Sequence, residues 1–186
     1  DNWKTSYQYA FNLGNTSDGN LHIKFVTKTG HIIPYIHNGI TYILSITGLT
    51  SDKNVRIGNN SIIPGNGVAF PSMFNNLTIS LPVSCSITIG GITESYSVVR
   101  VGTYAFSHLT ISEITIPSII TYINSFAFYN TPINNNLIFE ETFDTNYVSN
   151  SNLIEIGTNA FMNSIQGSSL LYVNIPSNVQ TIKTNA

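Results

Sequence analysis

The sequence predicts a mainly β protein, with a β-rich N-terminal domain or cap over residues 1–76 and a solenoid of short strands and turns over residues 77–186. Two phrases that recur at a fixed offset in the second half predict the solenoid. Short alternating apolar runs between turn residues predict the β-rich first part. No stretch carries apolar residues at the i, i+3, i+4 spacing of an amphipathic helix.

One recurring phrase ends on alanine followed by phenylalanine. It stands at 101–106, 123–128 and 156–161, and again, without its last residue, at 182–186. A second phrase, of alternating apolar residues closed by proline, stands at 111–117 and 170–176. In both cases the next phrase begins six residues after the proline. Two motifs at one offset predict about four repeats, of which the last is incomplete.

The proline-ended phrase has the period of a strand. In Ile114-Thr115-Ile116 the isoleucines point to one side and the threonine to the other. Pro117 cannot donate to a strand ladder and therefore ends the strand. After Pro117 the chain is expected to run back along the opposite side of the coil, here called the return side, where Ile120 and Ile123 face the same core.

The alanine–phenylalanine phrase predicts a close-packed corner. Gly102 and Gly157 fit a tight backbone bend at its start. The small alanine beside a large ring in each copy predicts that the phenylalanines stack on one another from repeat to repeat. The expected stack consists of Phe106, Phe128 and Phe161.

Weaker copies of the strand phrase at 79–82 and 137–140 are each followed by an insertion. The step to the next phrase is 19 residues in the first case and 16 in the second, in place of six, and Glu140 replaces the proline. Insertions at one position of a repeat project from one face, which is often the binding face. In the first insertion we expect a β-hairpin over 83–97 that turns at Gly90-Gly91.

These phrases, together written LxxIxIPxxVxxIGxxAFxx, resemble the BspA-type leucine-rich repeats of bacterial and protist surface proteins over about residues 77–186. The stretch 81–102, with its glycine pair after a proline, resembles the longer first repeat of that family. The resemblance implies an irregular leucine-rich-repeat solenoid, a secreted or cell-surface location, and recognition of a partner protein without catalysis.

Residues 1–76 show no clear copy of the repeat. Residues 21–26 and 40–46 alternate like strands, and Asn38-Gly39 is a hairpin turn dipeptide. Residues 62–71 are rich in Pro, Gly and Asn and predict a loop. We place the domain boundary near residues 70–77.

Composition excludes two classes of partner. Only 9% of the residues are charged, where about 25% is usual, and the net charge is −2. The seven Lys and Arg are spread along the chain and form no basic stripe for nucleic acid. The longest apolar runs are far shorter than a bilayer span, so no membrane insertion is expected. The start at Asp1, without Met, fits a removed signal peptide.

No catalytic group, metal site or cofactor is expected. His31 and His37 flank a bend, but no Cys or carboxylate stands nearby at ligand spacing. Cys85 begins an alternating run and is interpreted as a small core residue. The acidic cluster Glu140, Glu141 and Asp144 lies in the second insertion and is interpreted as a solvated loop.

Tyrosine among Asn and Ser is typical of adaptable binding surfaces. The candidate partner-binding residues are therefore the tyrosines on or near the repeat faces, Tyr122, Tyr129, Tyr147 and Tyr172. The first hypothesis is protein–protein recognition or adhesion. The second is head-to-tail assembly of copies of this chain into a fibre or surface layer, through an edge formed by Ile175, Val179 and Ile182. A third is carbohydrate binding through the N-terminal β domain and exposed aromatic residues.

Overall fold

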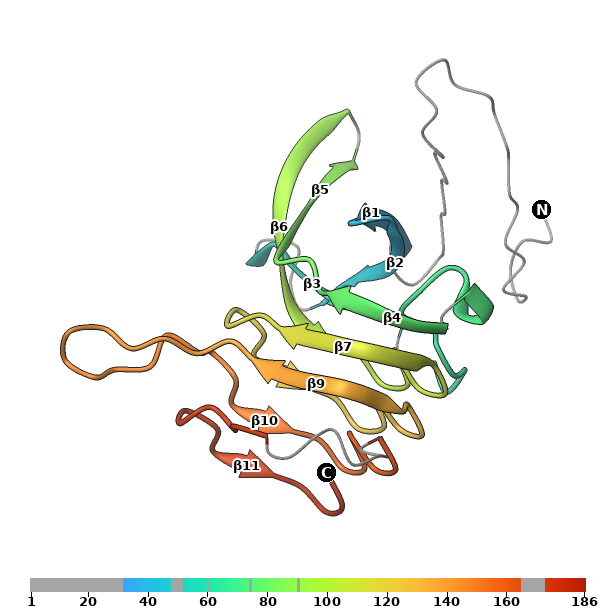
Figure 1. Cartoon of the computed structure of the whole chain (residues 1–186). Helices are drawn as coiled ribbons and strands as arrows, with labels where there is room; N and C mark the ends of the chain where they lie inside the picture. The colour runs from blue at the N-terminus through green and yellow to red at the C-terminus, as the bar shows by residue number, and fades with distance from the viewer. Residues whose placement is uncertain (1–31, 48–51, 60, 74, 90, 165–172) are drawn as a thin grey trace.

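The computed structural model describes residues 32–47, 52–59, 61–73, 75–89, 91–164 and 173–186. Strands dominate these ranges and form two sheets (Figure 1). One, here called the β7 sheet, consists of β4 (Asn75–Ser80), β7 (Thr110–Ile116) and β9 (Ile133–Phe139). The described ranges also contain a short 3-10 helix, Pro71–Met73.

The other sheet, here called the β6 sheet, runs in the order β1, β2, β3, β6, β8, β10, β11, with β5 paired to the side of β6. Its strands have the following bounds: β1 Ile32–His37, β2 Ile40–Ile46, β3 Asn54–Ile57, β5 Ser84–Ile89, β6 Ile92–Val101, β8 Tyr122–Ile123, β10 Glu155–Ile156 and β11 Thr181–Ile182.

From β6 to β10 the chain alternates between the two sheets, in the order β6, β7, β8, β9, β10. β4, β7 and β9 are parallel neighbours, and so are β6, β8, β10 and β11. The first residues of the four copies of the alanine–phenylalanine phrase stand in one row across the β6 sheet, as Val101, Ile123, Ile156 and Ile182. The register derived from the sequence is therefore confirmed (Figure 1).

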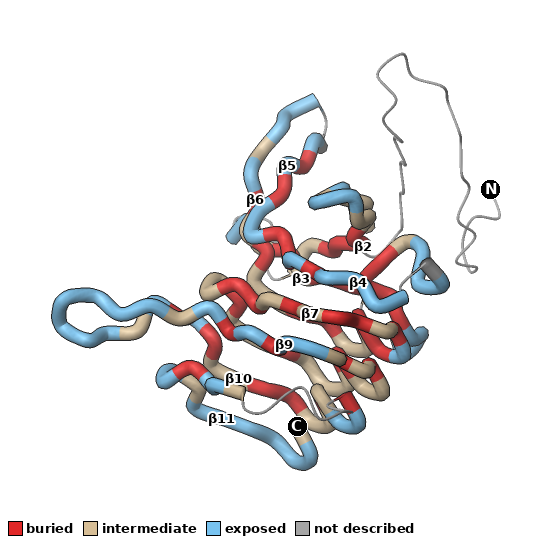
Figure 2. The backbone as a smooth tube through the Cα atoms, in the orientation of Figure 1, coloured by how far each residue is buried: buried red, intermediate tan, exposed pale blue. Residues whose placement is uncertain are grey.

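The strand phrase faces the core as expected in β7, but the described part of its second copy, residues 173–176, forms no strand and leaves Ile175 exposed. In β7, Ile114 and Ile116 are buried and Thr115 between them is half-buried. Ile120 and Ile123 are buried from the return side. Figure 2 shows buried residues along the inner strands of the repeats, with exposed residues on β4, on β11 and on the projecting segments.

A row of aromatic rings runs through the core at the corners. Phe106 and Phe128 stack with centroids 5.1 Å apart, and Phe128 and Phe161 stack at 4.8 Å. Tyr42 of β2 meets the first ring edge-on at 6.4 Å, and Phe139 of β9 meets the last edge-on at 6.1 Å. The predicted stacking is confirmed, although Phe161 at its end is half-buried and not buried as expected, and Tyr42 extends the row toward the N-terminal strands.

The glycines at the corners serve a purpose other than the predicted one. Neither Gly102 nor Gly157 has a positive φ, so neither is needed for a left-handed bend. A Cβ on Gly102 would lie 2.5 Å from the Ile57 carbonyl oxygen, and one on Gly157 would lie 2.5 Å from the Ser125 nitrogen. Glycine is required there because the backbone of the preceding coil approaches closely.

The predicted hairpin is present, and both insertions begin at one edge. β5 and β6 pair antiparallel from Ser84↔Ser97 to Ile89↔Ile92, across the glycine pair. The two insertions follow the ends of β4 and β9, which both pair in parallel with β7. From that edge the two insertions run in different directions. The β5–β6 hairpin extends upward beside β1, and the segment around 140–152 projects sideways (Figure 1).

The first described strands continue the repeat sheet. β1 and β2 form a hairpin that turns at Asn38 and Gly39, both with positive φ, which confirms this turn and the strand over 40–46. β3 pairs in parallel with β6, so that Ile57 stands beside Val101. β3 thereby adds a parallel strand to the row of β6, β8, β10 and β11, although residues 1–76 show no clear copy of the repeat in sequence. Residues 21–26 lie outside the described residues, and the domain boundary near 70–77 stays a prediction.

A candidate recognition surface on the repeats

The second insertion, residues 140–152 and here called the projecting loop, is anchored at its base. The Glu140 N–H donates to the Ile116 carbonyl oxygen at 2.9 Å. The Glu141 carboxylate accepts from the Ser177 N–H at 2.8 Å and from the Ser177 hydroxyl at 2.7 Å. Hydrogen bonds from the hydroxyls of Ser149 and Ser177 hold the pKa of Glu141 below its usual value. The loop is thereby joined to the coils before and after it.

The tip of the projecting loop is closed by Asp144. One oxygen of its carboxylate accepts from the N–H of Asn146 at 2.8 Å and of Val148 at 2.9 Å, and these bonds lower the pKa of Asp144. The Tyr147 N–H donates to the Asp144 carbonyl oxygen at 3.0 Å. Tyr147 itself has a φ of 60°, a backbone conformation that is uncommon for a bulky residue. The tip is therefore a defined turn.

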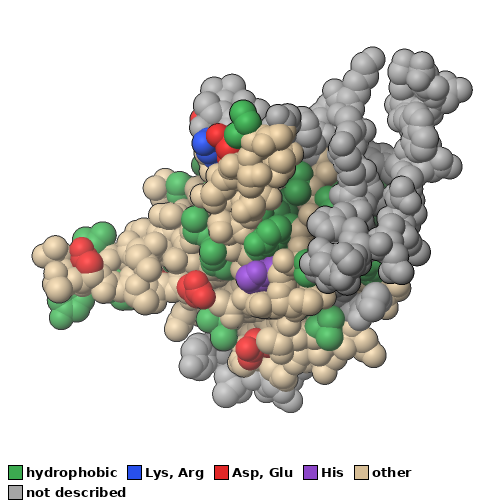
Figure 3. All heavy atoms as spheres, turned by 90° about the horizontal axis from the view of Figure 1, so that it is seen from above, with side chains coloured by type: hydrophobic (Ala, Val, Ile, Leu, Met, Phe, Trp, Pro, Cys, Tyr) green, Lys and Arg blue, Asp and Glu red, His purple; other side chains and the backbone are tan. Residues whose placement is uncertain are grey.

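This turn exposes apolar side chains. Tyr147 is 88% exposed, Val148 59% and Phe143 54%. Figure 3 shows hydrophobic side chains at the end of the projecting loop, beside a single acidic group. The predicted candidate Tyr147 belongs to this group. Phe143 and Val148 were not predicted as candidates, although their place inside an insertion is a signal that could have identified them.

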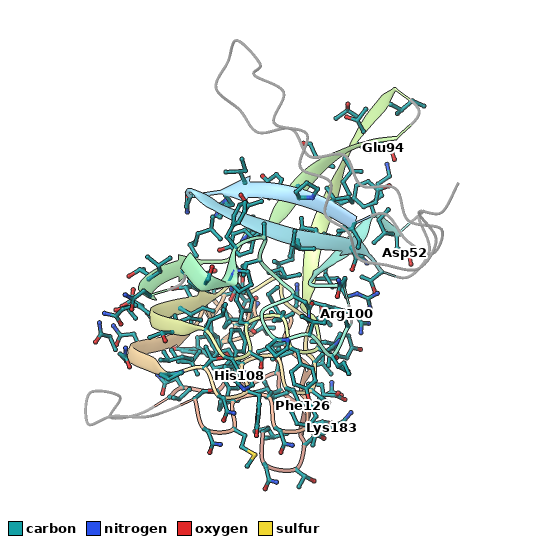
Figure 4. The ribbon with its side chains drawn as sticks, turned by 90° about the vertical axis from the view of Figure 1, so that its right-hand side faces the viewer. Asp52, Glu94, Arg100, His108, Phe126 and Lys183 are labelled. Atoms are coloured by element: carbon teal, nitrogen blue, oxygen red, sulfur yellow. The ribbon has the colours of Figure 1, made fainter. Side chains whose placement is uncertain are left out.

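A second aromatic cluster lies on the corners. The rings of Tyr104 and Phe126 stack at 4.9 Å with an interplanar angle of 4°. Tyr129, a predicted candidate, meets Phe126 edge-on at 5.6 Å and His108 at 5.7 Å. Figure 4 shows His108 and Phe126 on the corner side of the repeats. Tyr129 is half-buried in this cluster.

The four candidate tyrosines do not form one site. Tyr122 lies on β8, where the Arg100 guanidinium sits 4.0 Å above its ring. Among the described side chains, no ring contact joins Tyr122, Tyr129 and Tyr147 to one another. Tyr172 lies outside the described residues. A role for these tyrosines in binding remains a proposal.

The candidate assembly edge is partly exposed. Ile175 is 41% exposed and Ile182, on β11, is 59% exposed, while Val179 is half-buried against the core. These residues follow one another along the last described coil. Their role in assembly also remains a proposal.

The described side chains offer little for chemistry. Cys85 is buried, and burial raises the pKa of its thiol to about 11, so the thiol stays protonated at neutral pH. The carboxylates of Glu140, Glu141 and Asp144 each accept backbone N–H groups. His37 lies beside Tyr35 and Tyr42, and His31 lies outside the described residues. Within the described ranges no three His, Cys, Asp or Glu are grouped so that they could hold a metal.

Parallel strands stacked coil on coil, with phenylalanine rings stacked at three successive corners, are the features of a repeat protein. The chain belongs to the BspA-type leucine-rich repeat family, because the model of the "BspA type Leucine rich repeat region" matches residues 83–186 in 6 copies. No curated protein matches the chain. In the part of the chain that the structure describes, no helix is long and apolar enough to cross a membrane.

A solved structure has a similar fold. The crystal structure of the pneumococcal vaccine antigen PcpA matches with a TM-score of 0.54 at 24% sequence identity. The match covers 82% of this chain and 34% of PcpA, so the chain spans about a third of the length of that protein. The similarity supports the repeat architecture.

Proposed function

We propose that this chain is an extracellular or cell-surface module that binds a partner protein and catalyses no reaction. The observation that carries the proposal is the projecting loop, which presents Phe143, Tyr147 and Val148 on a frame fixed by hydrogen bonds. BspA-type repeats occur in surface proteins, and membership of that family supports the location.

The projecting loop suits protein recognition for an energetic reason. Binding energy at interfaces is concentrated in a few residues, among which aromatic anchors are enriched. A side chain held on an ordered turn loses less entropy on binding than one on a flexible segment. The bonds of Asp144 and Glu141 supply that order before a partner arrives.

Two other functions remain as alternatives. Assembly of copies of this chain is favoured by the exposed Ile175 and Ile182 on the last described coil. Carbohydrate binding through the N-terminal β domain and exposed aromatic residues is the third hypothesis, and the half-buried rings of Tyr104 and Phe126 add aromatic surface on the corners. In both cases Tyr147 would not contribute to binding.

The test compares the chain with the double variant Phe143→Ser/Tyr147→Ser on arrays of extracellular proteins and of glycans. We expect the chain to bind one or a few proteins, and the variant to lose at least about tenfold in affinity. Thr145→Ser, on the same exposed turn, is the matched control and should bind as the unmodified chain does. Binding to glycans alone, or filaments seen by light scattering with no loss in the variant, would contradict the proposal.

A further inference from the structure

The two arginines of the chain lie side by side. Among its seven Lys and Arg, only Arg56 and Arg100 are arginines. They come from β3 and β6, which are parallel neighbours, and they stand opposite each other in the register. Ile57 and Val101 beside them are buried, so the arginine side chains lie on the outer face of the β6 sheet.

Both guanidinium groups are held in place. Arg56 Nε donates to Ser45 Oγ at 3.0 Å, and the Ser45 hydroxyl donates to the Gly58 carbonyl oxygen at 2.6 Å. The Arg100 guanidinium stacks on the Tyr122 ring at 4.0 Å. Figure 4 shows Arg100 on the side of the molecule formed by the β6 sheet. An arginine has five N–H donors, so fixing Arg56 through Nε leaves its outer N–H groups for a ligand.

The carboxylates near these arginines are engaged elsewhere. Ser45, Arg56, Arg100, Tyr122 and Glu155 form one row across the sheet. Glu155 pairs with Lys183 at 2.7 Å, and Glu94 pairs with Lys53 at 2.8 Å. Among the described residues no ion pair involves either arginine. Burial and the neighbouring charge of Arg100 lower the pKa of Arg56, as expected for two like charges without a counter-ion.

We propose that Arg56 and Arg100, with the Tyr122 ring beside them, form a binding site for a carboxylate of a partner protein. Arginine binds carboxylates through two parallel N–H···O bonds, and two fixed guanidiniums on neighbouring strands can share one such group. An acidic side chain would neutralise the pair. A sugar acid fits less well, because the ring hydroxyls also need partners and the neighbouring Ser45 is already bonded. The site rests on the proposed binding of a protein, but on a surface separate from the tip of the projecting loop.

The test uses a fluorescent peptide of Glu and Gly with blocked ends, and the same peptide with Gln for Glu. Fluorescence anisotropy is measured at an ionic strength of about 0.01 M and again at about 0.15 M. We expect the Glu peptide to bind, more weakly at the higher salt, and the Gln peptide not to bind. Arg56→Gln/Arg100→Gln should lose at least about tenfold in affinity.

Three variants make the test specific. Lys53→Gln removes the same charge from a lysine that already has a carboxylate partner, and it should bind as the unmodified chain does. Arg56→Lys/Arg100→Lys keeps both charges but loses the paired N–H groups, and it should bind several-fold more weakly. Phe143→Ser/Tyr147→Ser should keep the peptide affinity, so failure of the loop proposal is distinguishable from failure of this one.

The proposal is overturned by three results. One is equal affinity for the Glu and Gln peptides. Another is unchanged affinity in the lysine variant, which would show that positive charge alone, without the paired N–H groups of arginine, accounts for peptide binding. The third is tighter binding of sialyllactose than of the Glu peptide, which would make a glycan the ligand. The lysine variant keeps the test decisive if the glutamine variant does not fold.

Discussion

In each copy of the alanine–phenylalanine phrase, the residue just before the alanine adopts a left-handed backbone. These residues are Tyr104, Phe126, Asn159 and Asn185, with φ values from 53° to 59°. Asparagine takes this conformation readily, whereas for a bulky side chain it is costly. Tyr104 and Phe126 offset part of that cost by stacking on each other.

The left-handed position gives a prediction at Asn159. Its side-chain oxygen is buried without a hydrogen-bond partner, so Gly and Ala variants both remove an unsatisfied group. Only glycine also tolerates the positive φ. Asn159→Gly should be more stable than Asn159→Ala by about 0.5–1 kcal/mol in urea denaturation.

The same pair of variants at Asn152 is the control. Asn152 is exposed and is not among the residues with positive φ. There alanine should be at least as stable as glycine, because glycine loses more entropy on folding. Equal stability of Gly and Ala at residue 159 would contradict the assigned backbone.

The sequence could predict part of this residue-level picture. Asn at 159 and 185 is a residue type that favours the left-handed region, but Tyr104 and Phe126 are not, and their stack depends on two coils meeting. Gly102 and Gly157 were predicted to form a bend, because a local pattern does not show which coils lie close together. Glycine is required there because the carbonyl oxygen of Ile57 and the nitrogen of Ser125, which belong to neighbouring coils, leave no space for a Cβ.

At the scale of elements, the aromatic row carries much of the packing between coils. Phe128 is fully buried between Phe106 and Phe161. Phe128→Ala should lower the free energy of unfolding by about 3–5 kcal/mol, because transfer and cavity terms add. The measurement is urea denaturation followed by circular dichroism.

Phe143→Ala is the matched control for Phe128→Ala. Its ring is exposed on the projecting loop, so its removal should change stability by no more than about 0.5 kcal/mol. If the two variants were equally stable, the rings at the corners would not form the buried row.

The elements that sequence reasoning predicted share a strong local signal. The period of two in β7 and the glycine pair of the β5–β6 hairpin are such signals. β3 was missed because no alanine–phenylalanine corner follows it. Its residues 55–58, Val-Arg-Ile-Gly, nevertheless resemble residues 99–102, Val-Arg-Val-Gly, and that likeness could have indicated that β3 pairs with β6.

At the scale of the whole molecule, the two candidate binding surfaces depend on contacts between distant residues. Arg56 and Arg100 meet only because β3 pairs with β6. The projecting loop is fixed only because Ser177 of a later coil binds Glu141. The sequence predicted Tyr147 as a candidate, but it could not predict which side chains would share its surface.

Contact between the projecting loop and a partner protein can be tested by site-specific photo-cross-linking. A benzophenone side chain replaces Tyr147 in one sample and Ile138, exposed on β9, in another. We expect light to join position 147 to a protein identified on the array, and position 138 to give little or no adduct. Adducts only between copies of this chain, or equal yields at both positions, would contradict it.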